Sequence, residues 1–333
     1  MREPKNIIIN GKNTKMEWCV ITNEFILMDR VQKIKQIINQ YGEENFYLSF
    51  SGGKDSTVLS ALVDLALPNN QIPRVFADTG IDLNIVRDFV FDMAKSDDRF
   101  VILKPSVPIK TMLENDGYPF KSKEHSHVLD IYNRHGMNCI TVPRYLGTRE
   151  DYGTRYSCPK ILRYQFTDDF KGKLKISDKC CFRLKEEPLD EWSKEHNKTC
   201  RILGIMPSEG GRRATTKCLA FKNNGKLLSF HPLASVTKEW EDWFISEYNI
   251  QICDIYYPPY NFDRTGCKGC PFNIYLQKEL DVLEKYFPNE KKQCEIIWKP
   301  VYDEYRRLGY RLKNNNYEQV ELEDYLKGLE MEE

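Results

Sequence analysis

Four of the eleven cysteines occur in two closely spaced pairs. Cys180 and Cys181 are adjacent, and Cys267 and Cys270 form a C-x-x-C motif, with residues 182–266 between the pairs. Four thiolates without a histidine suit an iron–sulfur cluster or a zinc ion. Because adjacent side chains diverge, two neighbouring cysteines chelate zinc poorly. The pattern therefore favours a cluster, with structural zinc and unliganded thiols as the alternatives.

A second stretch, S-G-G-K-D-S at 51–56, has the residues of a phosphate site. It follows the apolar run 45–50 and opens a helical pattern over 55–67. Glycines let the backbone approach an oxyanion, and a helix N-terminus offers unpaired N–H groups at the positive end of its dipole. The spacing is not that of a Walker A loop. The predicted cradle consists of Ser51, Gly52, Gly53, Lys54, Asp55 and Ser56.

Alternating strand and helix patterns surround this stretch. Strands are expected at 45–50, 74–77, 100–104, 201–205 and within 227–233. Helices are expected at 31–41, 55–67, 82–95, 237–248, 274–287 and 290–308. The order predicts a doubly wound, mostly parallel five-stranded α/β sheet. We expect one nucleotide-binding domain over 1–273, with an inserted loop and helix region at 106–174, and a C-terminal helical appendage at 274–333.

The second predicted strand ends in "FADTG" at 76–80. In a doubly wound sheet the ligand lies beyond the carboxyl ends of the strands. Asp78, Thr79 and Gly80 are therefore expected beside the phosphate loop, on the ribose or adenine side of a nucleotide. D-T-G is also a common sequence just before a helix, so this motif alone is weak evidence for a nucleotide site.

The composition sets limits on partners and location. Lys and Arg together number 49, as do Asp and Glu, so no net charge points to nucleic acid or a membrane. No stretch approaches the roughly 20 apolar residues of a membrane span. The first residues lack the pattern of an export signal. We expect a cytoplasmic protein without a membrane partner, in which thiols stay reduced.

The motifs together resemble a known family. S-G-G-K-D-S resembles the PP-loop of the adenine nucleotide α-hydrolase superfamily. Two further motifs resemble those of the sulfonucleotide (adenylyl sulfate and phosphoadenylyl sulfate) reductases. They are D-T-G after the second strand, and C-C followed some 80 residues later by C-x-x-C. "RILGIMPSEGGRRA" at 201–214 is similar to the family's fourth-strand segment, with Gly204, Glu209 and Arg213 matching. Met206 and Gly210 depart from that segment.

This resemblance implies specific roles. ATP or an adenylyl sulfate would bind in the cradle, with Mg²⁺ helping to stabilise the pyrophosphate leaving group, and a 4Fe–4S cluster would bind the four paired cysteines. Lys54, Asp55 and Arg213 are expected to act in catalysis, with Glu209 beside them. Basic residues would offset the charge of the cluster or receive an anionic substrate. These are Lys179, Arg183, Lys185, Arg264 and Lys268.

One departure limits the functional inference. The reductases carry the nucleophilic cysteine in a terminal E-C-G-[LI]-H tail, whereas the last cysteine here, Cys294, lies in a helical pattern and is expected in the core. Three hypotheses follow. The chain is an ATP-dependent adenylylating or sulfur-transfer enzyme that forms AMP and pyrophosphate. Alternatively, it is a sulfonucleotide reductase that releases sulfite with a thiol from elsewhere, or a non-catalytic nucleotide-binding cluster module of a mobile-element or defence complex.

The insertion could bind the acceptor. Arginines alternate with tyrosines there, which suits stacking on single-stranded nucleic acid, although a packed tyrosine-rich loop gives the same pattern. The residues concerned are Arg144, Tyr145, Arg149, Tyr152, Arg155 and Tyr156. A thiol or sulfur-donor protein is a further expected partner. The histidines 125, 127 and 135 are expected at the surface, because the surrounding sequence is polar.

Overall fold

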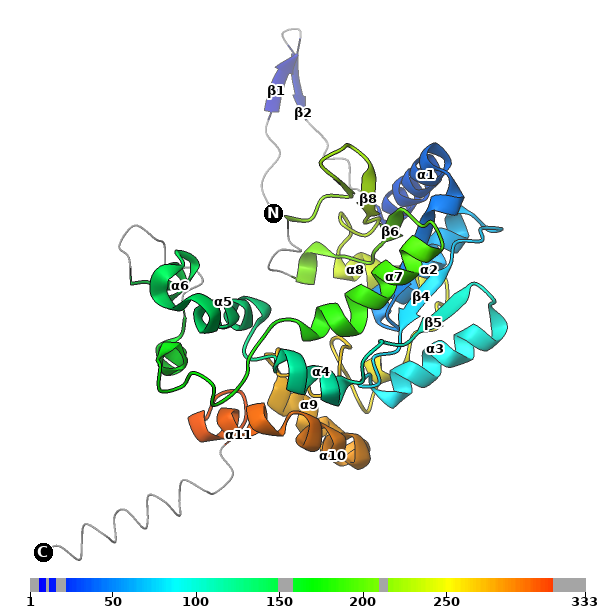
Figure 1. The fold of residues 1–333 in the computed structure, drawn as a ribbon. Coiled ribbons are helices and arrows are strands. Elements are labelled where there is room, and N and C mark those ends of the chain that lie inside the picture. The colour runs from blue at the N-terminus through cyan, green and yellow to red at the C-terminus, as the bar shows by residue number, and fades with distance from the viewer. Residues whose placement is uncertain (1–5, 10–11, 16–21, 149–157, 210–214, 314–333) are drawn as a thin grey trace, which may run out of the picture.

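The structure is a computed structural model that describes residues 6–9, 12–15, 22–148, 158–209 and 215–313. A six-stranded sheet, in the order β5-β4-β3-β6-β8-β7, forms its centre (Figure 1). The strands are β3 (Phe46–Phe50), β4 (Arg74–Ala77), β5 (Phe100–Leu103), β6 (Cys200–Ile202), β7 (Leu219–Phe221) and β8 (Leu227–Phe230). All pairings are parallel except β7 with β8. The predicted doubly wound α/β class is confirmed, with one strand more than expected.

The extra strand is β7, an antiparallel edge strand of three residues paired with β8. It is too short for its alternation of side chains to stand out in the sequence. Its antiparallel direction follows from the tight connection to β8, where Gly225 adopts a positive φ of 78°. The central strands β3 and β4 match their predicted positions, whereas β6 ends at Ile202, three residues earlier than predicted.

Side-chain alternation along β3 assigns its two faces. Phe46, Leu48 and Phe50 pack into a core with helices on one side, whereas Tyr47 points to the other face. The first core is covered by α1 (Asn23–Tyr41), α2 (Lys54–Ala66) and α8 (Lys238–Glu247), with Val90 of α3 (Asn84–Ser96) contributing. On the opposite face, Tyr47 meets Trp192 of α7 (Glu187–Glu195). The sheet is therefore covered by helices on both faces.

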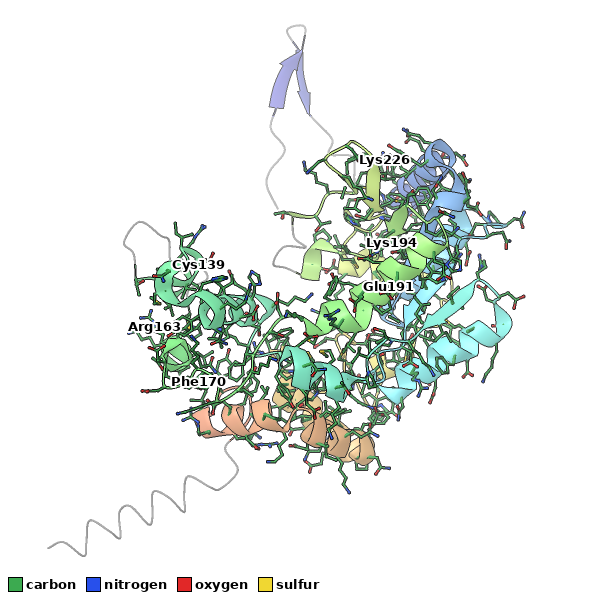
Figure 2. The ribbon with its side chains drawn as sticks, viewed as in Figure 1. Cys139, Arg163, Phe170, Glu191, Lys194 and Lys226 are labelled. Atoms are coloured by element: carbon green, nitrogen blue, oxygen red, sulfur yellow. The ribbon has the colours of Figure 1, made fainter. Side chains whose placement is uncertain are left out.

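The insertion and the C-terminal helices share a separate core. The insertion holds α4 (Ile109–Asp116), α5 (Lys123–His135) and α6 (Thr141–Leu146), and the C-terminal part holds α9 (Leu276–Tyr286), α10 (Pro288–Ile297) and α11 (Lys299–Leu308). Side chains from both parts pack together, Phe120 against Tyr305 among them. Cys139, Arg163 and Phe170 mark the insertion lobe in Figure 2, while Glu191 and Lys194 mark α7.

Two further features complete the described chain. Strands β1 (Asn6–Ile9) and β2 (Lys12–Lys15) form an antiparallel hairpin of their own. In the described ranges, no helix combines the length and apolar character needed to cross a bilayer.

Candidate functional site

The loop at 51–56, the predicted phosphate site, lies between the end of β3 and the start of α2. Gly52 has a φ of 69°, in the left-handed region that favours glycine. A Cβ on Gly52 would also come within 2.7 Å of Val90 and 2.8 Å of Val86, so a side chain would displace α3. The loop therefore requires glycine at this position for two independent reasons.

Internal hydrogen bonds hold the loop in shape. Ser56 Oγ donates to the carbonyl oxygen of Gly53 at 2.9 Å, and Thr57 Oγ1 donates to the same oxygen at 3.0 Å. Ser51 N–H donates to Ser56 Oγ at 3.2 Å. Gly204, at the end of β6, packs so closely that an added Cβ would lie 2.9 Å from the carbonyl oxygen of Asp55. Two neighbouring strand ends thus fix the predicted cradle.

Tyr256 covers the cradle, and sequence reasoning missed it. The backbone N–H of Lys54, at the N-terminus of α2, donates to Tyr256 Oη at 2.9 Å. Tyr256 Oη also lies 3.0 Å from Thr265 Oγ1. Burial raises the pKa of Tyr256 to about 12, so the hydroxyl is neutral at ordinary pH. This neutral oxygen stands where an oxygen of a bound phosphate would accept the same N–H.

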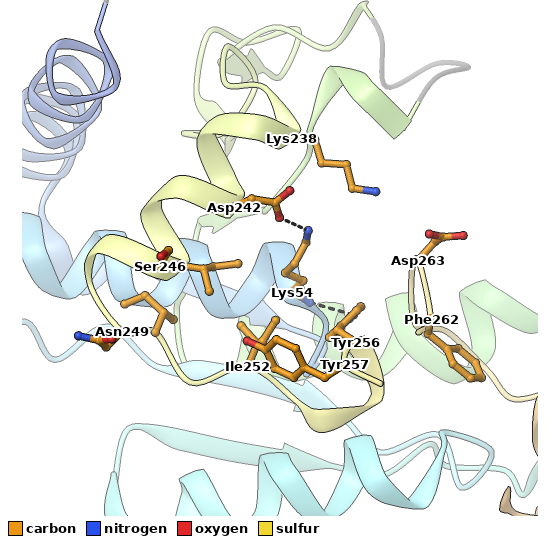
Figure 3. Close-up of a pocket in the computed structure, with 12 residues that line it drawn as sticks. Lys54, Lys238, Asp242, Ser246, Asn249, Ile252, Tyr256, Tyr257, Phe262 and Asp263 are labelled. Atoms are coloured by element: carbon orange, nitrogen blue, oxygen red, sulfur yellow. Dashed lines mark hydrogen bonds and ion pairs between the residues drawn. The ribbon is translucent and has the colours of Figure 1, made fainter. Parts of the chain in front are cut away.

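The ammonium group of Lys54 turns toward two acids of α8. Lys54 Nζ donates to Asp242 Oδ1 at 2.9 Å, as Figure 3 shows. It also lies 3.0 Å from Glu241 Oε2. Burial, together with the nearby Asp55, raises the pKa of Glu241 to about 7. The sequence predicted a phosphate contact for Lys54, whereas in this structure its charge is held by carboxylates. Helical spacing shows which residues share a face of α8, but not that one of them faces α2.

A cavity of about 630 Å³ opens beside Lys54. Its lining combines aromatic and aliphatic side chains with charged groups, as Figure 3 shows. The principal residues are Lys54, Lys238, Asp242, Ile252, Tyr256, Tyr257, Phe262 and Asp263. The D-T-G residues 78–80 do not line this cavity. The cavity therefore lies beside the cradle and toward α8, away from the expected ribose and adenine side.

The D-T-G residues form a compact turn after β4. Thr79 donates from both its backbone N–H and its Oγ1 to Asp82 Oδ2, at 3.0 and 2.8 Å. Asp78 is buried and pairs with Arg87 of α3 at 3.2 Å. Gly80 has a φ of 73°, and its N–H donates to Asp78 Oδ1. The turn is rigid and lies at the carboxyl edge of the sheet, as predicted.

The same turn touches the cysteine region. Asp82 and Cys267 form an isolated antiparallel bridge, and Lys268 N–H donates to the carbonyl oxygen of Ile81 at 2.8 Å. The C-x-x-C motif is therefore attached directly to the strand-end loop next to the cradle.

The thiols of both cysteine pairs influence one another's pKa. A hydrogen bond between the neighbours lowers the pKa of Cys181 to about 6 and raises that of Cys180. Burial raises the pKa of Cys267 to about 11 and also that of Cys270, and both thiols interact with Cys181. The two pairs, separated by 85 residues of sequence, thus lie near enough in the fold to affect each other's ionisation. Within the described ranges, however, no group of three or more His, Cys, Asp or Glu side chains is arranged to hold a metal ion.

Of the basic residues predicted around the thiols, Lys185 faces them. Its pKa is raised mainly by Cys267, and its Nζ lies 3.6 Å from Asp82 Oδ1. Arg183 instead pairs with Asp116 and Glu187, and Lys179 lies 3.9 Å from Asp116. Lys268 is buried in an ion pair with Glu290, 3.1 Å away.

Other residues singled out from the sequence lie elsewhere than expected or outside the described ranges. His125 is fully buried, not at the surface, with Nε2 2.7 Å from Gln165 Oε1 and Nδ1 3.0 Å from Tyr145 Oη. Tyr145 is therefore a core residue, which supports the packed-loop interpretation for that position. Glu209 ends a short 3₁₀ turn (Pro207–Glu209). Outside the described residues lie Arg213, Arg149, Tyr152, Arg155 and Tyr156.

Cys294 is buried in α10, as predicted. Burial raises the pKa of its thiol to about 12. Its Sγ would lie 2.8 Å from a Cβ added at Gly269, so it packs against the C-x-x-C loop. In this fold Cys294 therefore fills space behind that loop.

The site therefore belongs to an α/β protein with a mostly parallel sheet and a Ser-Gly-Gly turn after β3. Residues 141–273 match the phosphoadenosine phosphosulfate reductase domain family, which confirms the resemblance over the part that holds both cysteine pairs. The phosphate loop at 51–56 lies outside the matched residues. No curated protein sequence matches the chain.

Solved structures with a similar arrangement are distant. Phosphoadenylyl-sulfate reductase from Candida auris is 14% identical, with a TM-score of 0.38 over 72% of this chain and 93% of that one. NH3-dependent NAD synthetase from Campylobacter jejuni is 14% identical, with a TM-score of 0.37 over 84% and 94%. FMN adenylyltransferase from Candida glabrata is 12% identical, with a TM-score of 0.40 over 72% and 62%.

Proposed function

We propose that the protein is an iron–sulfur enzyme that uses ATP to adenylylate an acceptor and then replaces the adenylyl group by sulfur. One observation carries this proposal: the turn at 78–82 pairs with the C-x-x-C motif through Asp82 and Cys267, and it follows β4, the strand next to β3 and its loop at 51–56. A nucleotide in the cradle would therefore lie near the thiols. Such proximity is what a two-step transfer between the two sites requires.

Binding of the nucleotide would depend on the start of α2. The N–H groups at Gly53 and Lys54 face the cradle, and a phosphate oxygen would replace Tyr256 Oη as the acceptor of the Lys54 N–H. The hydroxyls of Ser51 and Ser56 lie 3.1 Å apart at the same place. We also propose catalytic roles for Asp55 and for Arg213, which lies outside the described residues, with Mg²⁺ accompanying the phosphates.

The four cysteines fit a 4Fe–4S cluster by the chemistry of their donor atoms. Cys180, Cys181, Cys267 and Cys270 supply four sulfurs, and the charge of Lys185 would offset the negative charge of a thiolate-bound cluster. When bound, the cluster would supply a site that holds sulfur for transfer. The chain's own contribution would be to hold the C-x-x-C motif beside the turn at 78–82, through the bridge between Cys267 and Asp82.

The reaction balances as two displacements. An oxygen of the acceptor attacks the α-phosphorus of ATP, the bond to the β-phosphate oxygen breaks, and pyrophosphate leaves with the electron pair. Sulfur at the hydrosulfide level then attacks the acceptor carbon, the carbon–oxygen bond breaks, and AMP leaves. The positive end of α2 would stabilise the charge that develops on the phosphates. A nucleic acid remains one candidate for the acceptor.

A second candidate is sulfonucleotide reduction, which the family match over residues 141–273 favours. That reaction needs a cysteine thiolate that reaches the sulfate. Cys294 is buried, with a pKa raised to about 12, and so is unsuited to this role. A reductase of this kind would require a thiol from another protein or a small molecule.

The test compares products from anaerobically purified protein. We expect AMP and pyrophosphate from ATP in the presence of the right acceptor, and no sulfite above background from adenylyl sulfate with thioredoxin or glutathione. Robust sulfite release that Cys294→Ser abolishes would overturn the assignment in favour of a reductase. Cys218→Ser is the matched control, because Cys218 lies beside Arg30 of α1, away from both cysteine pairs.

A further inference from the structure

Glu241 is a buried acid in direct contact with the phosphate site. Its side chain is about 1% exposed, although α8 leaves its neighbour Asp242 largely in solvent. Neither Glu241 oxygen accepts a hydrogen bond of good geometry within the described part of the chain. Lys54 Nζ is only 3.0 Å from Oε2, so the two charges form a close ion pair that is poorly aligned as a hydrogen bond.

Among the residues that the structure describes, Glu241 depends on one cation, Lys54. The charged groups that interact with it are Lys54, which stabilises its charge, and Asp55, which opposes it, both on α2. On α8 itself, Asp242 competes for the same ammonium group. A buried carboxylate that loses its cation is strongly destabilised, whereas the protonated form is not.

We propose that Glu241 is a positioning residue for Lys54 and that it takes up one proton from solvent when Lys54 turns to a bound phosphate. The inference rests on the proposed binding of a nucleotide at 51–56. Lys54 cannot satisfy a phosphate and both carboxylates with equal geometry, because Glu241 and Asp242 both belong to α8 and hold its ammonium group at 3.0 and 2.9 Å. Figure 3 shows the contact with Asp242. The raised pKa of Glu241 agrees with this coupling.

The first experiment measures proton uptake by titration calorimetry with ATP at pH 8, in buffers of different ionisation enthalpy. Phosphate groups have a second pKa near 6 and contribute little at that pH. We expect about one proton taken up per ATP bound, and an affinity that falls by up to about tenfold per pH unit between pH 7 and 9. Glu241→Gln should abolish both effects, while the matched control Asp242→Asn retains them. Equal proton uptake in the wild type and Glu241→Gln, or none in the wild type, would overturn the proposal.

A second experiment needs no nucleotide and remains decisive if ATP does not bind. Unfolding by urea is measured between pH 6 and 9 for Lys54→Met, Glu241→Gln and the double variant. Lys54→Met should lose stability steeply as pH rises, because Glu241 then ionises without a partner, and the double variant should lose this slope. Parallel pH profiles of Lys54→Met and the double variant would show that Glu241 does not depend on Lys54. Failure of ATP binding alone would instead refute the proposed function.

Discussion

Glu290 joins the C-terminal helices to the cysteine region, and Glu290→Ala should be among the most damaging substitutions outside the sheet. Glu290 Oε2 accepts hydrogen bonds from Lys268 Nζ and from the backbone N–H of Asn84, each at 3.1 Å. The side chains of Glu290 and Lys268 are about 5% and 3% exposed. Removing the acid leaves an ammonium group and a helix N–H without their acceptor.

The magnitude follows from this burial. Breaking one partner of a buried ion pair costs about 3–5 kcal/mol. Domains are typically stable by about 5–15 kcal/mol, so Glu290→Ala should remove a large fraction of the free energy of unfolding. Urea unfolding followed by circular dichroism measures this loss. The matched control is Asp303→Ala, which breaks the exposed pair with Lys299 on α11 and should cost less than about 0.5 kcal/mol.

The double variant Lys268→Met/Glu290→Leu isolates the cause. Replacing both charges by apolar groups of similar size is often neutral or stabilising, so the double variant should be more stable than Glu290→Ala. A loss below about 1 kcal/mol for Glu290→Ala would refute the reasoning. It would mean that water reaches Lys268 when the acid is absent.

Three further predictions concern other parts of the molecule. Gly204→Ala should cost about 1–3 kcal/mol and weaken ATP binding in calorimetry, because its Cβ would meet the Asp55 carbonyl; unchanged binding would contradict this. Burial lowers the pKa of His125 from 6.5 to about 4, so on acidification this histidine is protonated in the unfolded chain before it is protonated in the folded one. The free energy of unfolding should therefore fall by about 2 kcal/mol as the pH is lowered from 7 to 5. His125→Gln should flatten this pH dependence of urea unfolding; an unchanged slope would exclude His125 as its source. Anaerobic protein should contain about four irons per chain, a content that Cys180→Ser lowers; stoichiometric zinc without iron or sulfide would contradict the cluster.

The sequence predicted the parts of the site that are built locally. The apolar run of β3, the two glycines and the start of α2 are consecutive, so their order alone indicates a strand, a turn and a helix N-terminus. The turn at 78–82 was predicted for the same reason. His125 was misassigned from its polar neighbours, although it shares a helix face with Leu129 and Tyr132, which are buried.

Contacts between distant segments could not be predicted in this way. Tyr256 meets the Lys54 N–H across 202 residues of sequence, and Asp242 meets the Lys54 ammonium across 188. Helical periodicity places Glu241 one residue after the buried Trp240, a position that could face either a neighbouring helix or solvent. Only the packing of α8 against α2 decides which of these holds.

Two buried acids with a lysine partner therefore have different roles in one fold. The Glu290 carboxylate accepts two hydrogen bonds, from Lys268 Nζ and from the backbone N–H of Asn84, and these bonds stabilise its charged form. Removing Glu290 should therefore lower the free energy of unfolding. Glu241 is equally buried, but its oxygens accept no well-aligned hydrogen bond in the described chain. A buried ion pair without such support is costly to keep. The difference in hydrogen bonding, and not the difference in burial, separates a pair that joins helices from a pair whose lysine can change partners when an anion binds.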